Sequence, residues 1–191
     1  ILKCQNCKML YSDVPSNTKG TSTFSHNSFK GYLDSAEYVQ ERIKKLLTFL
    51  ESNYIDKNEH STLLDIGCGA GWSLLAAKSM NYECLGIEPM KEAADYAVNN
   101  LNVKVINSKY QSSIINKHND IIILDQVAEH VSAPLNFLKD VTKNLKPGGI
   151  LFIAVPPNDW LRRLLSLSIQ VSYKTMLSIH KSNLLILKKL L

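Results

Sequence analysis

The stretch of sequence that decides the fold is Leu63-Leu64-Asp65-Ile66-Gly67-Cys68-Gly69-Ala70-Gly71-Trp72. An apolar run leads directly into three closely spaced glycines, a pattern that predicts a buried strand, a tight turn and the start of a helix. Glycine has no Cβ, so the backbone of such a turn can adopt positive φ and approach a ligand closely. The amides that open the following helix attract an anionic group. The stretch therefore predicts a site for a nucleotide cofactor.

The spacing of the glycines discriminates between cofactors. Dinucleotide-binding folds use G-x-G-x-x-G, whereas this chain has Gly67-x-Gly69-x-Gly71. Trp72 stands where the third glycine of the dinucleotide pattern would lie, and its indole would obstruct a pyrophosphate. A dinucleotide is therefore disfavoured, and the remaining motifs of the chain have to show which cofactor the turn binds.

Three further landmarks follow in order along the chain. Residues 83–87 predict a second strand, and Glu88-Pro89 follows about 20 residues after the glycine turn, where doubly wound folds place a ribose-binding carboxylate. Residues 120–124 form the continuous β-branched run of a central parallel strand. Residues 145–151 combine a helix end, a Pro-Gly turn and another strand.

These motifs, with the triplet Glu129-His130-Val131 after the fourth strand, resemble the class I S-adenosylmethionine-dependent methyltransferases that act on small molecules. The resemblance covers roughly residues 32–158. It implies that the glycine turn holds the methionine part of S-adenosylmethionine and that Glu88 contacts the ribose. His130 follows the fourth strand near the cofactor side and is the best-placed candidate for a catalytic base, or it holds loops together, as this histidine often does in the family. The cofactor-binding residues that it implies are Asp65, Gly67, Cys68, Gly69, Gly71, Glu88, Pro89, Asp125 and Gln126.

The order of the predicted elements indicates an α/β fold with a doubly wound, mainly parallel sheet and helices on both faces, a Rossmann-like methyltransferase fold. An apolar stripe at helical spacing predicts a helix that begins at a capping box, with Asp34 as the cap. Further helices are expected over 73–79, 91–101 and 133–145, and a third strand over 103–106. Ligands should bind outside the carboxyl ends of the strands.

Two departures from the family pattern bear on the site. Related quinone O-methyltransferases carry extra glutamates beside the Glu-His pair, but Gln126 occupies one of those positions, so no catalytic metal is expected. Residues 107–110 lack the acidic side chain that often binds the adenine amino group, so the adenine contact is left unassigned. His26 is a second, weaker candidate for a base, and Tyr32 and Tyr38 are expected near the mouth of the site or as ordinary packing residues.

Length and composition fit one ordinary globular domain. The chain has 191 residues, of which 45% are hydrophobic and 20% are charged. No run approaches the roughly 18 apolar residues of a membrane span, and no signal-peptide pattern opens the chain, so a cytoplasmic location is expected. Basic and aromatic residues are not interleaved on a recognisable module, and no nucleic-acid partner is expected.

The N-terminal segment, residues 1–31, is polar and is expected to be mostly loop. Cys4 and Cys7 form a C-x-x-C pair that is either one half of a zinc ribbon or two ordinary thiols. Because the chain opens on Ile1 and ends in leucines and lysines, we expect it to be a piece of a longer polypeptide.

The C-terminal segment, residues 159–191, is basic: from Trp160 onward it has six Lys and Arg residues and no Asp or Glu. It contains no Gly or Pro, and we expect a helical lid or substrate segment. Its cations are either solvated, or face an anionic acceptor or a membrane surface. Residues 180–191 resemble the family's helix before its final antiparallel strands, which we therefore expect to be missing.

The sequence thus predicts transfer of a methyl group from S-adenosylmethionine to a small-molecule acceptor by in-line displacement. A sugar, a lipid-linked saccharide or a biosynthetic intermediate is the expected acceptor. One alternative is a protein of the same fold that binds the cofactor without catalysis. The other is an NAD(P)-dependent oxidoreductase, which Trp72 and the glycine spacing disfavour.

Overall fold

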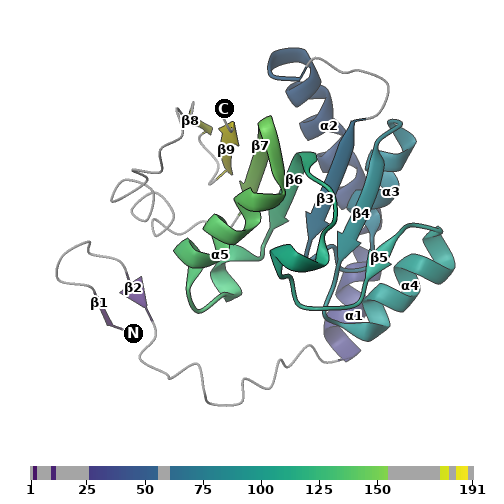
Figure 1. Cartoon of the computed structure of the whole chain (residues 1–191). Helices are drawn as coiled ribbons and strands as arrows, with labels where there is room; N and C mark the ends of the chain where they lie inside the picture. The colour runs from purple at the N-terminus through teal and green to yellow at the C-terminus, as the bar shows by residue number, and fades with distance from the viewer. Residues whose placement is uncertain are drawn as a thin grey trace.

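The computed structural model describes residues 2–3, 10–11, 26–55, 61–154, 177–180 and 184–188. Within these ranges the main sheet has seven strands in the order β5-β4-β3-β6-β7-β9-β8, with helices on both faces (Figure 1). Five neighbouring strands of this sheet, β5, β4, β3, β6 and β7, run parallel. Strands β9 and β8 extend it beyond β7, where β9 is antiparallel to β7 and β8 is antiparallel to β9. The doubly wound, mainly parallel α/β fold is confirmed.

The strands of the main sheet coincide with the apolar runs of the sequence. Central strands of a parallel sheet are covered on both faces and therefore consist almost entirely of aliphatic residues. The strands are β3 (Thr62–Ile66), β4 (Glu83–Ile87), β5 (Val105–Ile106), β6 (Asn119–Asp125), β7 (Leu145–Ala154), β8 (Leu177–His180) and β9 (Leu184–Lys188). A separate antiparallel pair is formed by β1 (Leu2–Lys3) and β2 (Leu10–Tyr11).

The helices alternate with the parallel strands, as βαβ connections require. The α-helices are α1 (His26–Asp34), α2 (Ala36–Asn53), α3 (Trp72–Ser79), α4 (Lys91–Leu101) and α5 (Pro134–Val141). Short 3₁₀ turns are η1 (Ser112–Ile114), η2 (Ala128–His130) and η3 (Thr142–Asn144).

The hydrophobic core consists of two layers, one on each face of the sheet. In β6, Ile121 and Ile123 belong to the first layer, whereas Ile122 and Leu124 belong to the second, because neighbouring side chains of a strand point to opposite faces. Helices α2 and α3 cover the first layer and α5 covers the second (Figure 1). The carboxyl ends of the parallel strands are thereby held at one common edge.

The C-terminal residues correct one prediction. We expected the final antiparallel strands to be missing and the chain to end in helices, but β9 pairs with β7 and β8 pairs with β9. The backbone register joins Phe152 to Ile186. The run 184–188 is strongly apolar and lies beside a buried strand whose free edge needs a partner, so sheet pairing outweighs helix formation.

The N-terminal helices correct a second prediction. Helix α1 begins at His26, within a segment expected to be loop, and its Phe29 ring packs edge-on against Tyr96 with centroids 5.7 Å apart. Asp34 ends α1 rather than capping the next helix, because Ser35 is the residue that precedes α2. Ser35 makes no side-chain cap and instead donates its hydroxyl to the Tyr32 carbonyl at 2.9 Å.

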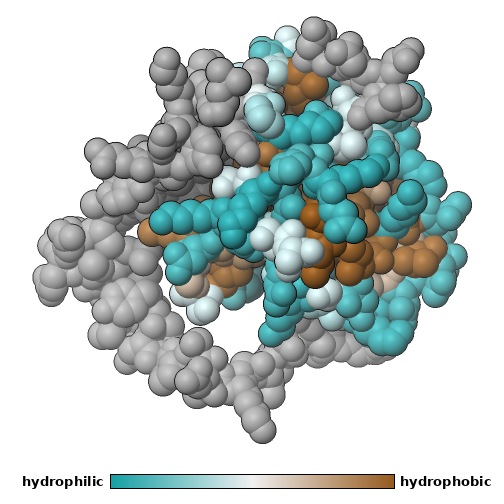
Figure 2. Space-filling model, in the orientation of Figure 1, coloured by the Kyte–Doolittle hydropathy of each residue, from teal (hydrophilic) through white to brown (hydrophobic). Residues whose placement is uncertain are grey.

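Some predictions fall on residues that the structure does not describe. Cys4 and Cys7, with the two interpretations of that pair, lie outside the described residues, as do residues 155–176 of the basic segment. No helix within the described ranges combines the length and hydrophobicity that crossing a membrane requires. The face seen in Figure 2 is mainly hydrophilic, with a hydrophobic patch toward the side of the sheet that ends in β5.

Candidate functional site

The glycine turn joins β3 to α3 at the carboxyl edge of the sheet. Gly67, Gly69 and Gly71 all have positive φ, at 78°, 53° and 85°, as the glycine pattern predicted. The amides of Gly67 and Cys68 donate to the carbonyl of Ile87 at 2.7 and 3.2 Å. The turn is therefore bonded to the end of β4, and its conformation is fixed by the neighbouring strand.

Asp65 lies below this turn, fully inside the protein. Its side chain receives a hydrogen bond from the Ser73 hydroxyl through Oδ2, while Oδ1 is buried and has no hydrogen-bond partner within the described structure. Burial raises the pKa of Asp65 to about 7, an effect that the Ser73 hydroxyl opposes and the Glu88 carboxylate reinforces. A buried acceptor without a donor is costly, so Oδ1 is suited to a ligand that brings one.

Glu88 faces the turn from the end of β4. Its carboxylate accepts the Gly69 amide at 2.9 Å and the Met90 amide at 2.7 Å, and only 5% of the residue is exposed. Burial raises its pKa, against the two amide hydrogen bonds, which lower it. Each carboxylate oxygen retains a lone pair, so Glu88 can still accept hydroxyl donors from a ligand.

The residues after β5 support the Glu88 turn. The Asn107 side-chain amide donates to the carbonyls of Glu88 and Pro89 at 2.8 and 3.2 Å. Pro89, predicted to shape this turn, is exposed and directly follows the buried Glu88. The polar residue at 107 thus braces the proposed ribose side of the site.

The segment after β6 closes against the glycine turn. A Cβ built on Gly67 would lie 2.5 Å from a methyl carbon of Val127, so the turn and this segment are in direct contact. Gln126 also has positive φ, at 58°, and its backbone N–H donates to the Ala154 carbonyl at 2.8 Å. Positive φ outside glycine stores strain that the surrounding structure must hold, which is common at functional sites.

Asp125 at the end of β6 forms an ion pair with Arg42 of α2. The guanidinium donates to both carboxylate oxygens, one contact measuring 3.2 Å, and it also lies 5.7 Å from the ring centroid of Tyr38. Asp125 was predicted to form a wall of the cofactor site. Because Arg42 binds both oxygens of this carboxylate, Asp125 offers the wall a fixed side chain and not a free hydrogen-bond acceptor.

The predicted base, His130, lies in η2 with about two thirds of its side chain exposed. Its Nε2 is 3.9 Å from Oε1 of Glu129, whose own pKa is raised by burial. Glu129 Oε2 is buried and has no partner in the part of the chain that the structure describes. No group of three or more His, Cys, Asp or Glu side chains arranged for a metal ion occurs among the described residues.

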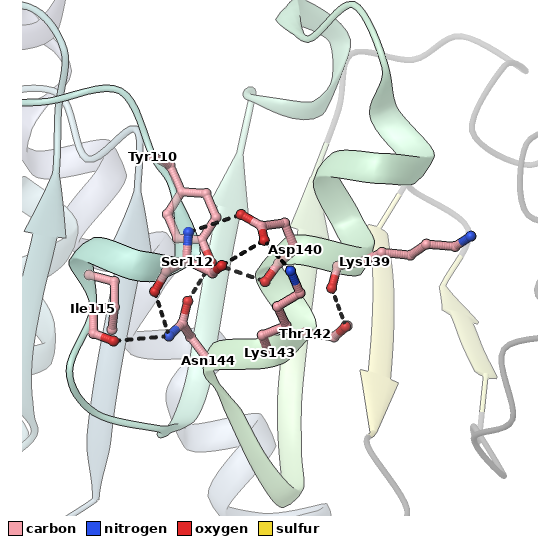
Figure 3. Close-up of polar contacts among 8 residues, drawn as sticks. All are labelled: Tyr110, Ser112, Ile115, Lys139, Asp140, Thr142, Lys143 and Asn144. Carbon is pink, nitrogen blue, oxygen red and sulfur yellow. Dashed lines mark hydrogen bonds and ion pairs between the residues drawn. The ribbon is translucent and has the colours of Figure 1, made fainter.

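A polar network holds the segment between β5 and β6. The Ser112 amide and hydroxyl both donate to Asp140 of α5, at 2.9 and 2.6 Å, and Lys143 pairs with the same carboxylate. The Tyr110 hydroxyl donates to Asn144 Oδ1 at 2.6 Å. Figure 3 shows these side chains pointing toward one another from the two segments. The network ties the stretch after β5, where the adenine contact was left unassigned, to α5 and η3.

Sequence reasoning missed several residues around the site. Ser73 lies eight positions after Asp65 in the sequence. It could have been found from the strand-turn-helix geometry, which brings the two side chains together. Arg42 had no local signal, because its partner lies 83 positions away. Trp72 was used only as an argument against a dinucleotide, although its indole bonds to the Tyr32 carbonyl at 2.7 Å.

The strand order, the glycine turn and the buried carboxylate after the neighbouring strand together define a class I S-adenosylmethionine-dependent methyltransferase fold. A family model described as "Methyltransferase domain" matches residues 35–184. The chain belongs to this family.

Curated relatives align with part of this chain. The "Ubiquinone biosynthesis O-methyltransferase" of Rickettsia bellii (strain OSU 85-389) is 26% identical over 118 residues, which cover 59% of this chain and 49% of that protein. Its counterpart in Coxiella burnetii (strain Dugway 5J108-111) is 29% identical over 114 residues, covering 56% of this chain and 48% of that protein. The chain thus spans about half the length of the curated relatives it matches.

Solved structures agree on the fold. A putative S-adenosyl-L-methionine-dependent methyltransferase from Methanococcus maripaludis superposes with a TM-score of 0.66 at 13% identity, covering 86% of this chain and 92% of that chain. The plantazolicin methyltransferase BpumL, solved in complex with SAH (S-adenosylhomocysteine), gives a TM-score of 0.59 at 21% identity over 78% of this chain and 60% of its own. At these identities the likeness concerns the fold alone.

Proposed function

We propose that this chain catalyses the transfer of a methyl group from S-adenosylmethionine to a hydroxyl group of a small molecule. The family and the fold support the methyl transfer. The relatives named for ubiquinone biosynthesis are O-methyltransferases and support an oxygen acceptor on a biosynthetic intermediate. This choice is narrower than the sequence-based expectation, which also included sugars and lipid-linked saccharides.

The observation that carries the proposal is the buried, unpartnered Oδ1 of Asp65 beside the glycine turn. The α-ammonium group of S-adenosylmethionine would supply the donor that this oxygen lacks. Glu88, at the other side of the turn, has lone pairs for the two ribose hydroxyls. A positively charged ligand is further favoured here because the nearby Glu88 carboxylate raises the pKa of Asp65, and a cation beside Asp65 would offset that repulsion.

The chain's own contribution to the reaction is binding, orientation and proton removal. When bound, S-adenosylmethionine supplies an activated methyl group, so the hard chemistry belongs to the cofactor. Asp65 would hold its methionine part and Glu88 its ribose, and Gln126, Val127 and Cys68 would line the space between them. The contact between Val127 and Gly67 places the segment after β6 against the turn, where it would help to orient the cofactor and the acceptor.

Proton removal from an acceptor hydroxyl falls to His130 in this proposal. Its imidazole is exposed and follows β6, close in sequence to the proposed cofactor wall, and it can pass a proton to solvent. In a His130→Gln variant we expect unchanged cofactor affinity and a kcat lowered about 100-fold. An unchanged kcat would remove His130 from the reaction and leave the cofactor assignment intact.

The cofactor assignment is tested by calorimetry. S-adenosylmethionine and SAH are titrated into the wild type and into Asp65→Asn and Glu88→Ala variants, with NADH as the competing dinucleotide and Lys139→Ala as a surface control. We expect binding of both sulfur ligands by the wild type and the control, and a loss of about tenfold or more in each carboxylate variant. Binding of NADH in their place would overturn the proposal. Methyl transfer is then measured on hydroxylated quinone-type and sugar acceptors, and transfer only to sugars would overturn the choice of a biosynthetic intermediate as the acceptor, while transfer to a hydroxyl group would stand.

A further inference from the structure

Tyr32, near the end of α1, contacts the glycine turn. Two carbons of its ring lie 3.4 Å from the position that a Cβ on Gly69 would occupy, which is ordinary van der Waals contact. The phenol is about half buried, and burial, with the neighbouring Glu88 carboxylate and Cys68, raises its pKa. The Tyr32 ring therefore lies beside the residues to which the proposed function assigns the cofactor.

Trp72 fixes the backbone of Tyr32. The indole Nε1 donates to the Tyr32 carbonyl at 2.7 Å, and the Ser35 hydroxyl donates to the same oxygen at 2.9 Å. Trp72 is the first residue of α3 and directly follows Gly71, so its position is set by the turn itself. The carbonyl near the end of α1 is thus bonded to the helix that begins at the cofactor cradle.

A cluster of aromatic rings reinforces this attachment. Trp72 packs edge-on against Tyr96 of α4 with centroids 5.8 Å apart, and Tyr96 packs against Phe29 of α1 at 5.7 Å. Tyr96 therefore contacts both α1 and the indole. Edge-to-face ring pairs of this kind are directional, so they orient α1 as well as holding it.

From these contacts we propose that Tyr32 forms a wall of the cofactor site and that Trp72 is a positioning residue that holds this wall against the glycine turn. The inference rests on the cofactor assignment in the proposed function. The Tyr32 ring would pack on the aliphatic methionine part of the ligand, beside Gly69. Trp72, whose place in the sequence disfavours a dinucleotide, would thus also help to form the cofactor site by positioning Tyr32.

A double-mutant cycle tests the proposal, with SAH affinity measured by calorimetry. Trp72→Phe keeps a ring against Tyr96 but removes the indole donor, and we expect about fivefold weaker binding. Tyr32→Ala removes the wall, and we expect about 20-fold weaker binding. Because Trp72 acts through Tyr32, the double variant should bind like Tyr32→Ala to within about twofold.

Tyr96→Phe is the matched control, because it keeps the ring contacts and should leave the affinity unchanged. A merely structural role for Trp72 would lower the melting temperature of Trp72→Phe without this coupling. Wild-type affinity in a folded Trp72→Phe protein, or losses that simply multiply in the double variant, would overturn the proposal while leaving the proposed function standing. Failure of the wild type to bind SAH would overturn both.

Discussion

The buried carboxyl group of Asp65 makes the stability of the ligand-free protein depend on pH. Its pKa is raised by burial from 3.8 to about 7, so between these values the folded protein holds a proton that the unfolded chain releases. Stability from this group is therefore fully present below about pH 4 and is lost as the pH rises through about 7. For one proton the slope is at most about 1.4 kcal/mol per pH unit.

We expect Asp65→Asn to gain free energy of unfolding relative to the wild type as the pH rises from 5 to 7. The neutral amide keeps an acceptor for the Ser73 hydroxyl and has no charge to bury. Urea denaturation of both proteins at several pH values measures this difference. Parallel pH profiles for the two proteins would show that Asp65 ionises normally in the fold.

Ligand affinity should respond to pH with the opposite sign. Only the ionised Asp65 can pair with the ligand's ammonium group, so SAH should bind more tightly as the pH rises from 5.5 to 7. Affinity falls by at most about tenfold per pH unit below the pKa of Asp65. Calorimetry in this window avoids the titration of an α-amino group near about 7.7–8.0. A flat profile in the wild type would contradict the ammonium assignment, and Asp65→Asn should depend on pH less than the wild type does.

Gly71 is a glycine of the turn at which a side chain would be both strained and crowded. Its φ is +85°, and a Cβ there would lie 2.8 Å from the Ala97 Cβ and 3.2 Å from a Val103 methyl carbon. Backbone strain and overpacking together should destabilise Gly71→Ala by about 3 kcal/mol. Urea denaturation with Gly148→Ala as control separates the two effects, because Gly148 has a φ of +76° and open space around it. Equal losses in the two variants would show that packing against α4 is unimportant.

For single residues, the sequence predicted backbone conformation and burial, but it did not predict contacts between residues far apart in the chain. The positive φ of the three turn glycines and the burial of Glu88 follow from spacing and from the end of an apolar run. The ion pair between Arg42 and Asp125 joins helix α2 to β6 across 83 positions, and no local pattern indicates it. That Oδ1 of Asp65 lacks a hydrogen-bond donor likewise becomes known only when the groups around it are placed.

Among the elements, the turn between α5 and β7 depends on Asn144. Its side-chain amide donates to the carbonyls of Ser112 and Ile115 at 3.2 and 3.3 Å, while its oxygen accepts the Tyr110 hydroxyl. Asn144→Ala would leave these buried groups unpaired, and we expect a loss of about 2–4 kcal/mol in the free energy of unfolding. Lys139→Ala, at an exposed position of the preceding helix α5, should stay within about 0.5 kcal/mol. A loss below about 1 kcal/mol for Asn144→Ala would mean that water replaces the network.

Elements whose hydrophobic residues recur at a regular spacing were predicted well, and short continuous apolar segments were not. Helix α4 was expected over 91–101 and is found there, because its alanines and its flanking polar residues define one face. Residues 184–188 carry four consecutive aliphatic residues, which fit a helix face and a buried strand equally well. Only the neighbouring edge of β7 decides between the two, and that edge is a property of the assembled sheet.

For the molecule as a whole, β8 and β9 complete the sheet beyond β7. Deletion of residues 177–191 would remove the partner that pairs with β7 from Ile150 to Ala154. We expect a lower melting temperature and faster amide hydrogen exchange in β7, because its outer hydrogen-bonding groups become exposed at an edge. Exchange in β4 and β5, at the opposite side, serves as the internal control. Unchanged protection of β7 would show that the antiparallel pair adds little to the sheet.

The strands β3, β6 and β7 send alternate side chains into two hydrophobic layers that the sheet keeps apart. A change of volume beneath α2 is therefore relieved by neighbours in that layer, and substitutions in different layers should combine additively. Over evolutionary time, descendants of this chain can drift in one layer without compensation in the other. Their substitution histories should fall into two co-varying groups, and the turn from Gly67 to Gly71, which lies where both layers end, should be the constraint that every lineage shares.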